Sequence, residues 1–360
     1  MAQMVYNSTC SIRPSAASSV ALPIIYSILC IIGILGNTLS QWVFFWKIGK
    51  RTSTHIYLTH LVTANLLVCS AMPFMCSYFR EGSKWTYQSL PCKVVICFGT
   101  LSMHVSMFVS LTILTWIAIS RYATLMKHDP TQEKASLYEK IFFGRILKKF
   151  RQPDFAKKLC IYIWVIVLGV IAPIIIYYSI VEANVLNKTP EVEKCYNQKT
   201  EFGEQISQIA SHVGTAFVGF SLLVVVLSYS SFVSYLRKIR TRTAIMERCR
   251  IYSSVKRHIL VIQILLIVCF LPHGIFKPIF YALHKKDCQE LTYLVEIKNF
   301  FTCLAAARSS TDPFIFLLLD RTFKKSLSAL FKKSPESYSP KASPKHTADL
   351  FTENSTEMEK

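Results

Sequence analysis

Seven apolar stretches, each long enough to cross a lipid bilayer, divide this 360-residue chain. They are residues 21–46, 56–79, 94–121, 158–180, 207–235, 256–283 and 291–317. A helix rises about 1.5 Å per residue, so about 20 apolar residues cross a hydrocarbon core about 30 Å thick. Because short connections join most of these stretches, the pattern predicts an all-α membrane protein built as one seven-transmembrane-helix bundle.

Charged residues are scarce and unevenly distributed. They make up 17% of the chain, whereas about 25% is usual in soluble proteins. Of the 41 Lys and Arg residues, 28 lie on the side of the 47–55 loop and the C-terminus, if Lys158, Lys256 and Arg257 at the span ends are counted with that side. Nine lie on the side of the N-terminus, and the other four lie within the spans. Such an excess is typical of cytosolic loops, which predicts an extracellular N-terminus and a cytosolic C-terminus. The net charge of +20 therefore reflects topology and contact with anionic membrane lipids, and it argues against a nucleic-acid partner.

The chain is expected to have four parts. These are an extracellular segment, the bundle, an amphipathic helix at the inner leaflet and a disordered cytosolic tail, at residues 1–20, 21–319, 320–333 and 334–360. The amphipathic helix is inferred because Phe323, Leu327 and Leu330 share one face among lysines. The tail is too poor in apolar residues to fold.

Four of the 12 cysteines fall on the predicted outer side: Cys10, Cys92, Cys195 and Cys288. An even number of thiols in an oxidising compartment predicts two disulfides, with three pairings open. The sequons at Asn7 and Asn187 lie on the same side, where glycosylation can occur. The Cys and His spacings do not suggest a metal site, and we expect no cofactor.

A set of short motifs follows the spans in order. From the first span to the seventh they are Gly36-Asn37, Asn65-Leu66-Leu67 with Pro73, Ser120-Arg121-Tyr122, Trp164, Tyr229, Cys269-Phe270-Leu271-Pro272 and Asp312-Pro313-Phe314-Ile315-Phe316. Each motif alone is weakly specific, but the ordered set over about residues 20–333 resembles the rhodopsin-like (class A) G-protein-coupled receptors. Within that family the chain is similar to the nucleotide- and lipid-sensing group.

The resemblance implies a plasma-membrane receptor that binds an extracellular ligand between its helices and activates a heterotrimeric G protein. Arrestin is a further expected partner, through a phosphorylated tail. The implied coupling and switch residues are Arg121, Tyr122 and Tyr229, and Phe270, Pro272, Asp312, Pro313 and Phe316, respectively. The resemblance also implies the disulfides Cys92–Cys195 and Cys10–Cys288.

One departure from the family pattern concerns the coupling site. Ser120 stands where the family has an acid before Arg121, so the carboxylate that restrains this arginine at rest is missing. The loss of such an ion pair shifts a two-state equilibrium by about 1–3 kcal/mol. We therefore expect raised ligand-free activity.

A second departure lies midway through the bundle. Asn65 stands where the family has an Asp, and Arg308 precedes Asp312 by four residues, which places both charges on one helix face. In many relatives this region, with Ser110, holds a sodium ion. Two interpretations remain open. Arg308 is either a built-in cation that makes signalling insensitive to sodium or a member of a purely structural ion pair.

The candidate ligand-binding residues come from the third, sixth and seventh spans: Met103, His104, Met107, His273, Lys277, Tyr281 and Lys298. An amine receptor would carry an acid in place of Met103, and an opsin a lysine in place of Ala306. Lys277 and Lys298 stand where nucleotide-receptor relatives hold phosphates. They suit an anionic ligand such as a nucleotide, phospholipid or fatty acid. The alternative is that both lysines extend to the outer headgroups.

Two rival function classes were weighed against the receptor. The spans contain no HExxH motif and no Ser/His/Asp set with plausible spacing, so we do not expect an enzyme. Many transporters are built from duplicated halves, and no internal repeat occurs here, which disfavours a transporter. A receptor-shaped decoy or scaffold that does not couple stays open because of Ser120 and Phe316.

Overall fold

The computed structural model describes residues 15–49, 51–82, 89–126, 149, 152–177, 179–180, 205–240, 246–283, 288–319 and 321–331. Within these ranges the chain is helical and contains no strand. The helices are α1 (Leu22–Trp42), α2 (Ser53–Arg80), α3 (Ser89–Met126), α5 (Pro153–Tyr177), α7 (Gln205–Arg240), α8 (Met246–Leu283), α9 (Cys288–Leu319) and α10 (Arg321–Phe331). Short π-helical segments extend α1 at both ends, at Ala17–Ala21 and Val43–Lys47.

The seven long helices correspond one to one to the seven predicted spans, which confirms the predicted fold class. Five described segments are long and apolar enough to cross a membrane: Ser18–Lys47, Ser53–Arg80, Cys97–Ser120, Pro153–Tyr177 and Gln208–Ser228. In α8 the described apolar part is Ile267–Leu283. The mean hydropathy of α9 is reduced by Arg308 and Asp312, which lie in its C-terminal half.

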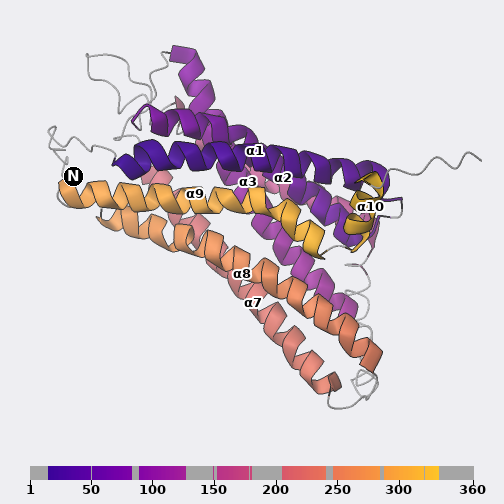
Figure 1. Ribbon diagram of the computed structural model, residues 1–360. Coiled ribbons are helices and arrows are strands. Elements are labelled where there is room, and N and C mark those ends of the chain that lie inside the picture. Colours follow the sequence, from indigo (N-terminus) through magenta and orange to yellow (C-terminus); the bar gives the residue numbers. More distant parts are fainter. Residues whose placement is uncertain are drawn as a thin grey trace, which may run out of the picture.

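Each long helix packs against two or more of the others. Helix α1 contacts α2 and α9, α8 contacts α7 and α9, and α3 contacts α2, α5 and α7. Figure 1 shows α1 and α9 side by side, whereas α7 and α8 run together and diverge from them toward the α10 end. The first described residues and α10 lie at opposite ends of the bundle (Figure 1).

Three aromatic rings attach α10 to the bundle. The ring centroid of Phe44, beyond the end of α1, lies 5.7 Å from that of Phe316 in α9 and 5.2 Å from that of Phe323 in α10. Phe323 and Leu327 are buried, while Lys324 and Lys325 are exposed. Helix α10 is thus amphipathic, and Phe316, a predicted switch residue, is part of its docking site.

Many large apolar side chains on α1 and α5 point out of the bundle. Ile28, Ile31 and Leu35 on α1, and Ile161 and Val165 on α5, are all more than half exposed. In a soluble protein such a surface would aggregate, but in a bilayer it faces lipid chains. The exposed apolar faces therefore agree with a bundle that lies within a membrane.

Candidate functional site

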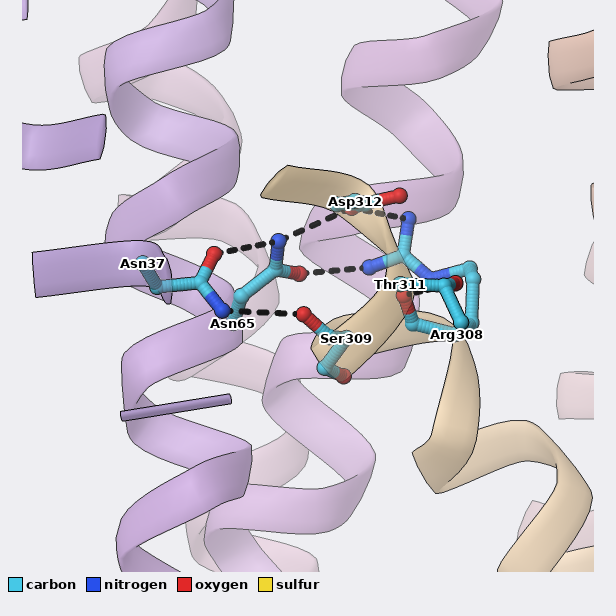
Figure 2. Close-up of polar contacts among 6 residues, drawn as sticks. All are labelled: Asn37, Asn65, Arg308, Ser309, Thr311 and Asp312. Atoms are coloured by element: carbon cyan, nitrogen blue, oxygen red, sulfur yellow. Dashed lines mark hydrogen bonds and ion pairs between the residues drawn. The ribbon is translucent and has the colours of Figure 1, made fainter. Parts of the chain in front are cut away.

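A buried polar network joins α1, α2 and α9 in the middle of the bundle (Figure 2). Its side chains belong to Asn37, Asn65, Arg308 and Asp312, and each is at most 4% exposed. Arg308 Nη2 donates a hydrogen bond of 2.7 Å to Asn65 Oδ1, and Asn65 Nδ2 donates one of 2.8 Å to Asp312 Oδ2. Arg308 Nη1 lies 3.2 Å from Asp312 Oδ2. The cation and the carboxylate are therefore paired directly and also bridged by one amide.

Asn37 connects this network to α1. Asn65 Nδ2 donates a second hydrogen bond, of 3.1 Å, to Asn37 Oδ1. Asn37 Nδ2 in turn donates to the carbonyl oxygens of Gly33 and Ser309, at 2.8 and 2.9 Å. Each Asn37 amide hydrogen thus has a carbonyl acceptor, so the side chain ties α1 to α9 without an unpaired donor.

Close packing of α1 depends on a glycine in the same region. A Cβ atom at Gly33 would collide with Cys69 Sγ of α2 and would lie 2.8 Å from Ser310 Oγ of α9. Ser310 Oγ also donates a 2.7 Å hydrogen bond to the Leu29 carbonyl oxygen. The missing side chain lets three helices approach closely enough for the polar network to form.

Arg308 also contacts the sixth predicted span. Its guanidinium carbon lies 5.3 Å from the ring centroid of Phe270 in α8, within the range of a cation–π interaction. Phe270 is buried as well. A predicted switch residue is therefore linked to the polar network through a charge rather than through a hydrogen bond. Ser110 of α3 is also buried, but its hydroxyl has no hydrogen-bond partner among the described residues, so it makes no hydrogen bond to the network.

A cavity of about 700 Å³ occupies the part of the bundle between this network and the N-terminal end of α1. Helices α2, α3, α5, α7, α8 and α9 contribute to its wall, and Phe270 and Arg308 contribute to its lining. All seven predicted ligand-binding residues line it: Met103, His104, Met107, His273, Lys277, Tyr281 and Lys298. The structure thus brings these residues together around one space, while their role in binding stays a prediction.

The ammonium group of Lys277 forms a hydrogen bond with the imidazole of His104. Its Nζ lies 3.1 Å from His104 Nε2, and His104 Nδ1 lies 2.8 Å from the Thr100 carbonyl oxygen. An ammonium group only donates and a carbonyl only accepts, so the geometry fits an imidazole with its proton on Nδ1. Among the described residues no carboxylate pairs with Lys277.

The second lysine that lines the cavity, Lys298, lies against an aromatic ring. Lys298 Nζ is 5.0 Å from the ring centroid of Phe280, which is fully buried. One turn further along α9, Thr302 donates a 2.8 Å hydrogen bond to the Lys298 carbonyl oxygen and lies 3.5 Å from His273 Nδ1. Positive and aromatic groups are therefore concentrated where α3, α8 and α9 meet.

Several predicted residues lie outside the described side chains or residues. Arg121 and Tyr122 belong to the last turns of α3 and Tyr229 to α7, but their side chains are not described. The same holds for Cys92 and Cys288, whereas Asn7, Cys10, Asn187 and Cys195 lie outside the described ranges altogether. Pro272 and Pro313 lie within α8 and α9. The coupling, disulfide and glycosylation assignments therefore stay predictions.

Two kinds of residue were missed from the sequence. Asn37 belongs to the Gly36-Asn37 motif, but no contact was predicted for its side chain, although an amide in the apolar first span is itself a signal of a buried polar contact. The apolar cavity walls from α5 and α7 were missed because Ile and Val are equally suited to packing, lipid contact and ligand contact.

Comparisons with known proteins agree with this architecture. Residues 36–316 match the family described as 7 transmembrane receptor (rhodopsin family). The chain is 68% identical to probable G-protein coupled receptor 82 of Homo sapiens over 91% of its own length and 97% of that protein. For the Mus musculus protein of the same name the identity is 62%, over 92% of this chain and 100% of that protein. Proteinase-activated receptor 2 of Rattus norvegicus is 23% identical, over 87% of this chain and 72% of that receptor. The chain therefore belongs to the rhodopsin family of seven-transmembrane receptors, multi-pass plasma-membrane proteins that are not enzymes and that signal through heterotrimeric G proteins.

Proposed function

We propose that this receptor responds to an anionic small molecule or lipid that binds in the cavity beside Lys277. One observation carries the proposal: Lys277 lines a largely apolar cavity, and its partner among the described residues is the neutral nitrogen of His104 rather than a carboxylate. A cation within a membrane is costly unless it is paired or hydrated. An anionic ligand supplies the missing negative charge, and the His104 contact aims the ammonium group into the cavity.

The ligand binds in the outer half of the bundle. The excess of Lys and Arg on one side supports an extracellular N-terminus and a cytosolic C-terminus. With that orientation the cavity lies toward the outer leaflet and the end of α3, with Arg121, toward the cytosol. Ligand binding shifts the bundle between two conformations, and the G protein binds at the cytosolic ends of the helices. Arrestin binds the phosphorylated tail as a second partner.

Arg308 serves as a fixed internal cation in place of a sodium ion. The support is its ion pair with Asp312, its hydrogen bond to Asn65 and its burial. Because the positive charge is covalently attached, it cannot exchange with the medium. The competing interpretation, a structural ion pair without a regulatory role, gives the same contacts and differs only in the effect of Arg308 variants on signalling.

The receptor signals without ligand because Ser120 stands where the family has an acid. This residue is buried near the end of α3 and carries no negative charge that would restrain Arg121. We expect signalling without ligand to be several-fold higher in the wild type than in Ser120→Asp, compared at equal surface expression. Equal signalling from the two proteins would remove the basis for this part of the proposal.

The first experiment measures ligand-free activation of each Gα family in transfected cells by the wild type and by Arg121→Ala, with matched surface expression. A basal signal that is lost in the variant supports a coupling receptor and names its Gα family. If both proteins are silent, anionic lipids and nucleotides are applied to the wild type and to Lys277→Gln. A response of the wild type that the variant lacks supports the proposal.

A non-coupling decoy or scaffold is the alternative function, and Ser120 and Phe316 are the observations that favour it. Such a protein binds an anionic ligand through Lys277 but recruits no G protein. Binding that depends on Lys277, without G-protein recruitment at any ligand concentration, would favour the decoy and exclude the signalling role.

A further inference from the structure

The cavity has an apolar side formed by α5 and α7. Ile166 and Val170 of α5, and Ile206, Ile209 and Val213 of α7, line the cavity and are also 44–65% exposed. Helix α5 packs chiefly against α3 and α2 and touches α7 at only a few residues. Exposed side chains in a cavity wall between two loosely packed helices point to an opening toward lipid.

The opposite side of the same cavity has a different chemistry. There α3, α8 and α9 contribute His104, His273, Lys277 and Lys298, whereas the residues from α5 are all aliphatic. The cavity is thus cationic and hydrogen-bonding at one side and hydrocarbon-like at the other. A hydrophilic ligand such as a nucleotide matches only the cationic side, because it has no hydrocarbon group to contact the aliphatic side.

We propose that the ligand is an amphiphile with an anionic headgroup and a single hydrocarbon chain, and that it reaches the cavity from the bilayer through the opening between α5 and α7. This inference rests on the proposed function, since Lys277 supplies the contact to the headgroup. A cavity of about 700 Å³ lies within the about 300–1,000 Å³ range of small-molecule pockets, which suits one chain with its headgroup better than a two-chain phospholipid.

The energetic argument favours access from the bilayer over access from water. A single-chain lipid is concentrated in the membrane because each buried methylene contributes about 0.8 kcal/mol of transfer free energy. Its chain then passes from lipid to the aliphatic residues of α5 and to Ile206, Ile209 and Val213 of α7 without crossing water. Binding to this receptor rather than to bulk lipid is therefore decided by the headgroup and its contact with Lys277.

The test uses the full-length receptor in phosphatidylcholine nanodiscs and a radiolabelled lysophosphatidate with an 18-carbon chain. The same headgroup on a six-carbon chain and inorganic phosphate are the soluble competitors. We expect the 18-carbon probe to bind, the six-carbon analogue to compete at least about 100-fold less well, and phosphate not to compete. In Lys277→Gln the probe affinity should fall at least about tenfold.

Variants at the opening test the path itself. In Ile166→Trp, association and dissociation of the 18-carbon probe should both slow about tenfold, because the larger ring narrows the path without touching the headgroup contact. Val165→Trp is the matched control. Val165 directly precedes Ile166 on α5 and is equally exposed, at 62% against 63% for Ile166, but it does not line the cavity. Val213→Trp, with Leu223→Trp as its control on α7, repeats the test if a variant on α5 unfolds. Thermal unfolding verifies that each variant is folded.

Three outcomes would overturn the inference, and they separate it from the proposed function. Probe kinetics unchanged in Ile166→Trp and Val213→Trp, together with equal affinity of the six-carbon analogue, would exclude the path while leaving the anion site at Lys277 intact. Displacement of the probe by inorganic phosphate at similar concentration would identify a free phosphate ligand instead of a lipid. If no anionic probe binds, or if Lys277→Gln binds as tightly as the wild type, both proposals fail.

Discussion

Arg308 and Lys277 are two cations inside the same bundle with opposite surroundings. Arg308 lies 3.2 Å from Asp312, donates to Asn65 and lies over the ring of Phe270. Lys277 lines a cavity and contacts His104. The protein itself supplies the counter-charge for Arg308, while among the described residues it supplies none for Lys277. The difference supports the proposal that the first cation holds helices together and that the second binds a ligand.

Removing a cation should therefore change the free energy of unfolding more in the polar network than in the cavity. Burial of an ion costs several kcal/mol, and only close pairing with further hydrogen bonds offsets this cost. The hydrogen bonding of Arg308 is incomplete. Its Nε has no hydrogen-bond partner within the described residues, and its Nη1 is close enough to Asp312 for an ion pair but forms no hydrogen bond there. The stability of the bundle should therefore fall when any member of the polar network is removed, whereas it should tolerate the loss of Lys277 from the cavity.

The largest effect is expected from Asp312→Leu, which removes the carboxylate and leaves Arg308 buried. We expect the free energy of unfolding to fall by about 3–5 kcal/mol, because an uncompensated charge then stays in the bundle. Thermal unfolding of the purified protein in detergent measures this change. The double variant Arg308→Met/Asp312→Leu should recover part of the loss. A double variant that loses the sum of the two single effects would show that the residues are not coupled.

A smaller effect is expected from Gly33→Ala, which inserts a methyl group against Cys69 and Ser310. Overpacking of this kind costs about 1–3 kcal/mol. Gly169→Ala on α5 is the matched control, because a Cβ there meets nothing within 4 Å. The control should be unchanged or slightly more stable, since alanine favours helix over glycine. Equal destabilisation by both substitutions would mean that close packing beside the network is not required.

The smallest effect is expected when sodium is exchanged for potassium at constant ionic strength. The unfolding temperature and the basal signal of the wild type should not change, because Arg308 occupies the position of the positive charge. The variant Asn65→Asp/Arg308→Ser supplies an additional carboxylate and removes the cation, so it should become sodium-sensitive. A sodium-specific rise in the unfolding temperature of the wild type would instead support an ion site that Arg308 does not fill.

Hydropathy predicted the number and order of the helices better than their ends. The third span was predicted at 94–121, but α3 runs from Ser89 to Met126, and α8 begins ten residues before the predicted sixth span at 256–283. An apolar window reports the thickness of the bilayer, whereas backbone hydrogen bonds can continue a helix into water. Helix length therefore could not be read from hydropathy alone.

The site was predicted where local spacing or a motif defines it. The four-residue interval between Arg308 and Asp312 is enough to place both on one helix face. The contacts of Asn37 and the lack of a hydrogen bond from Ser110 to the network depend on which helix faces meet, which a single sequence does not encode locally. The few contacts between α5 and α7 could not be predicted for the same reason, since they depend on how closely two apolar helices pack.

The most direct test of this account compares the unfolding temperatures of Arg308→Met and Lys277→Met in detergent without ligand. Both variants replace a cation by a methionine, so they change the net charge equally. The account expects Arg308→Met to unfold several degrees below the wild type, because Asp312 and Asn65 lose their partner. Lys277→Met should unfold at the wild-type temperature or above it. A similar decrease in both variants would contradict the distinction between a cation that holds the bundle together and one that is left for a ligand.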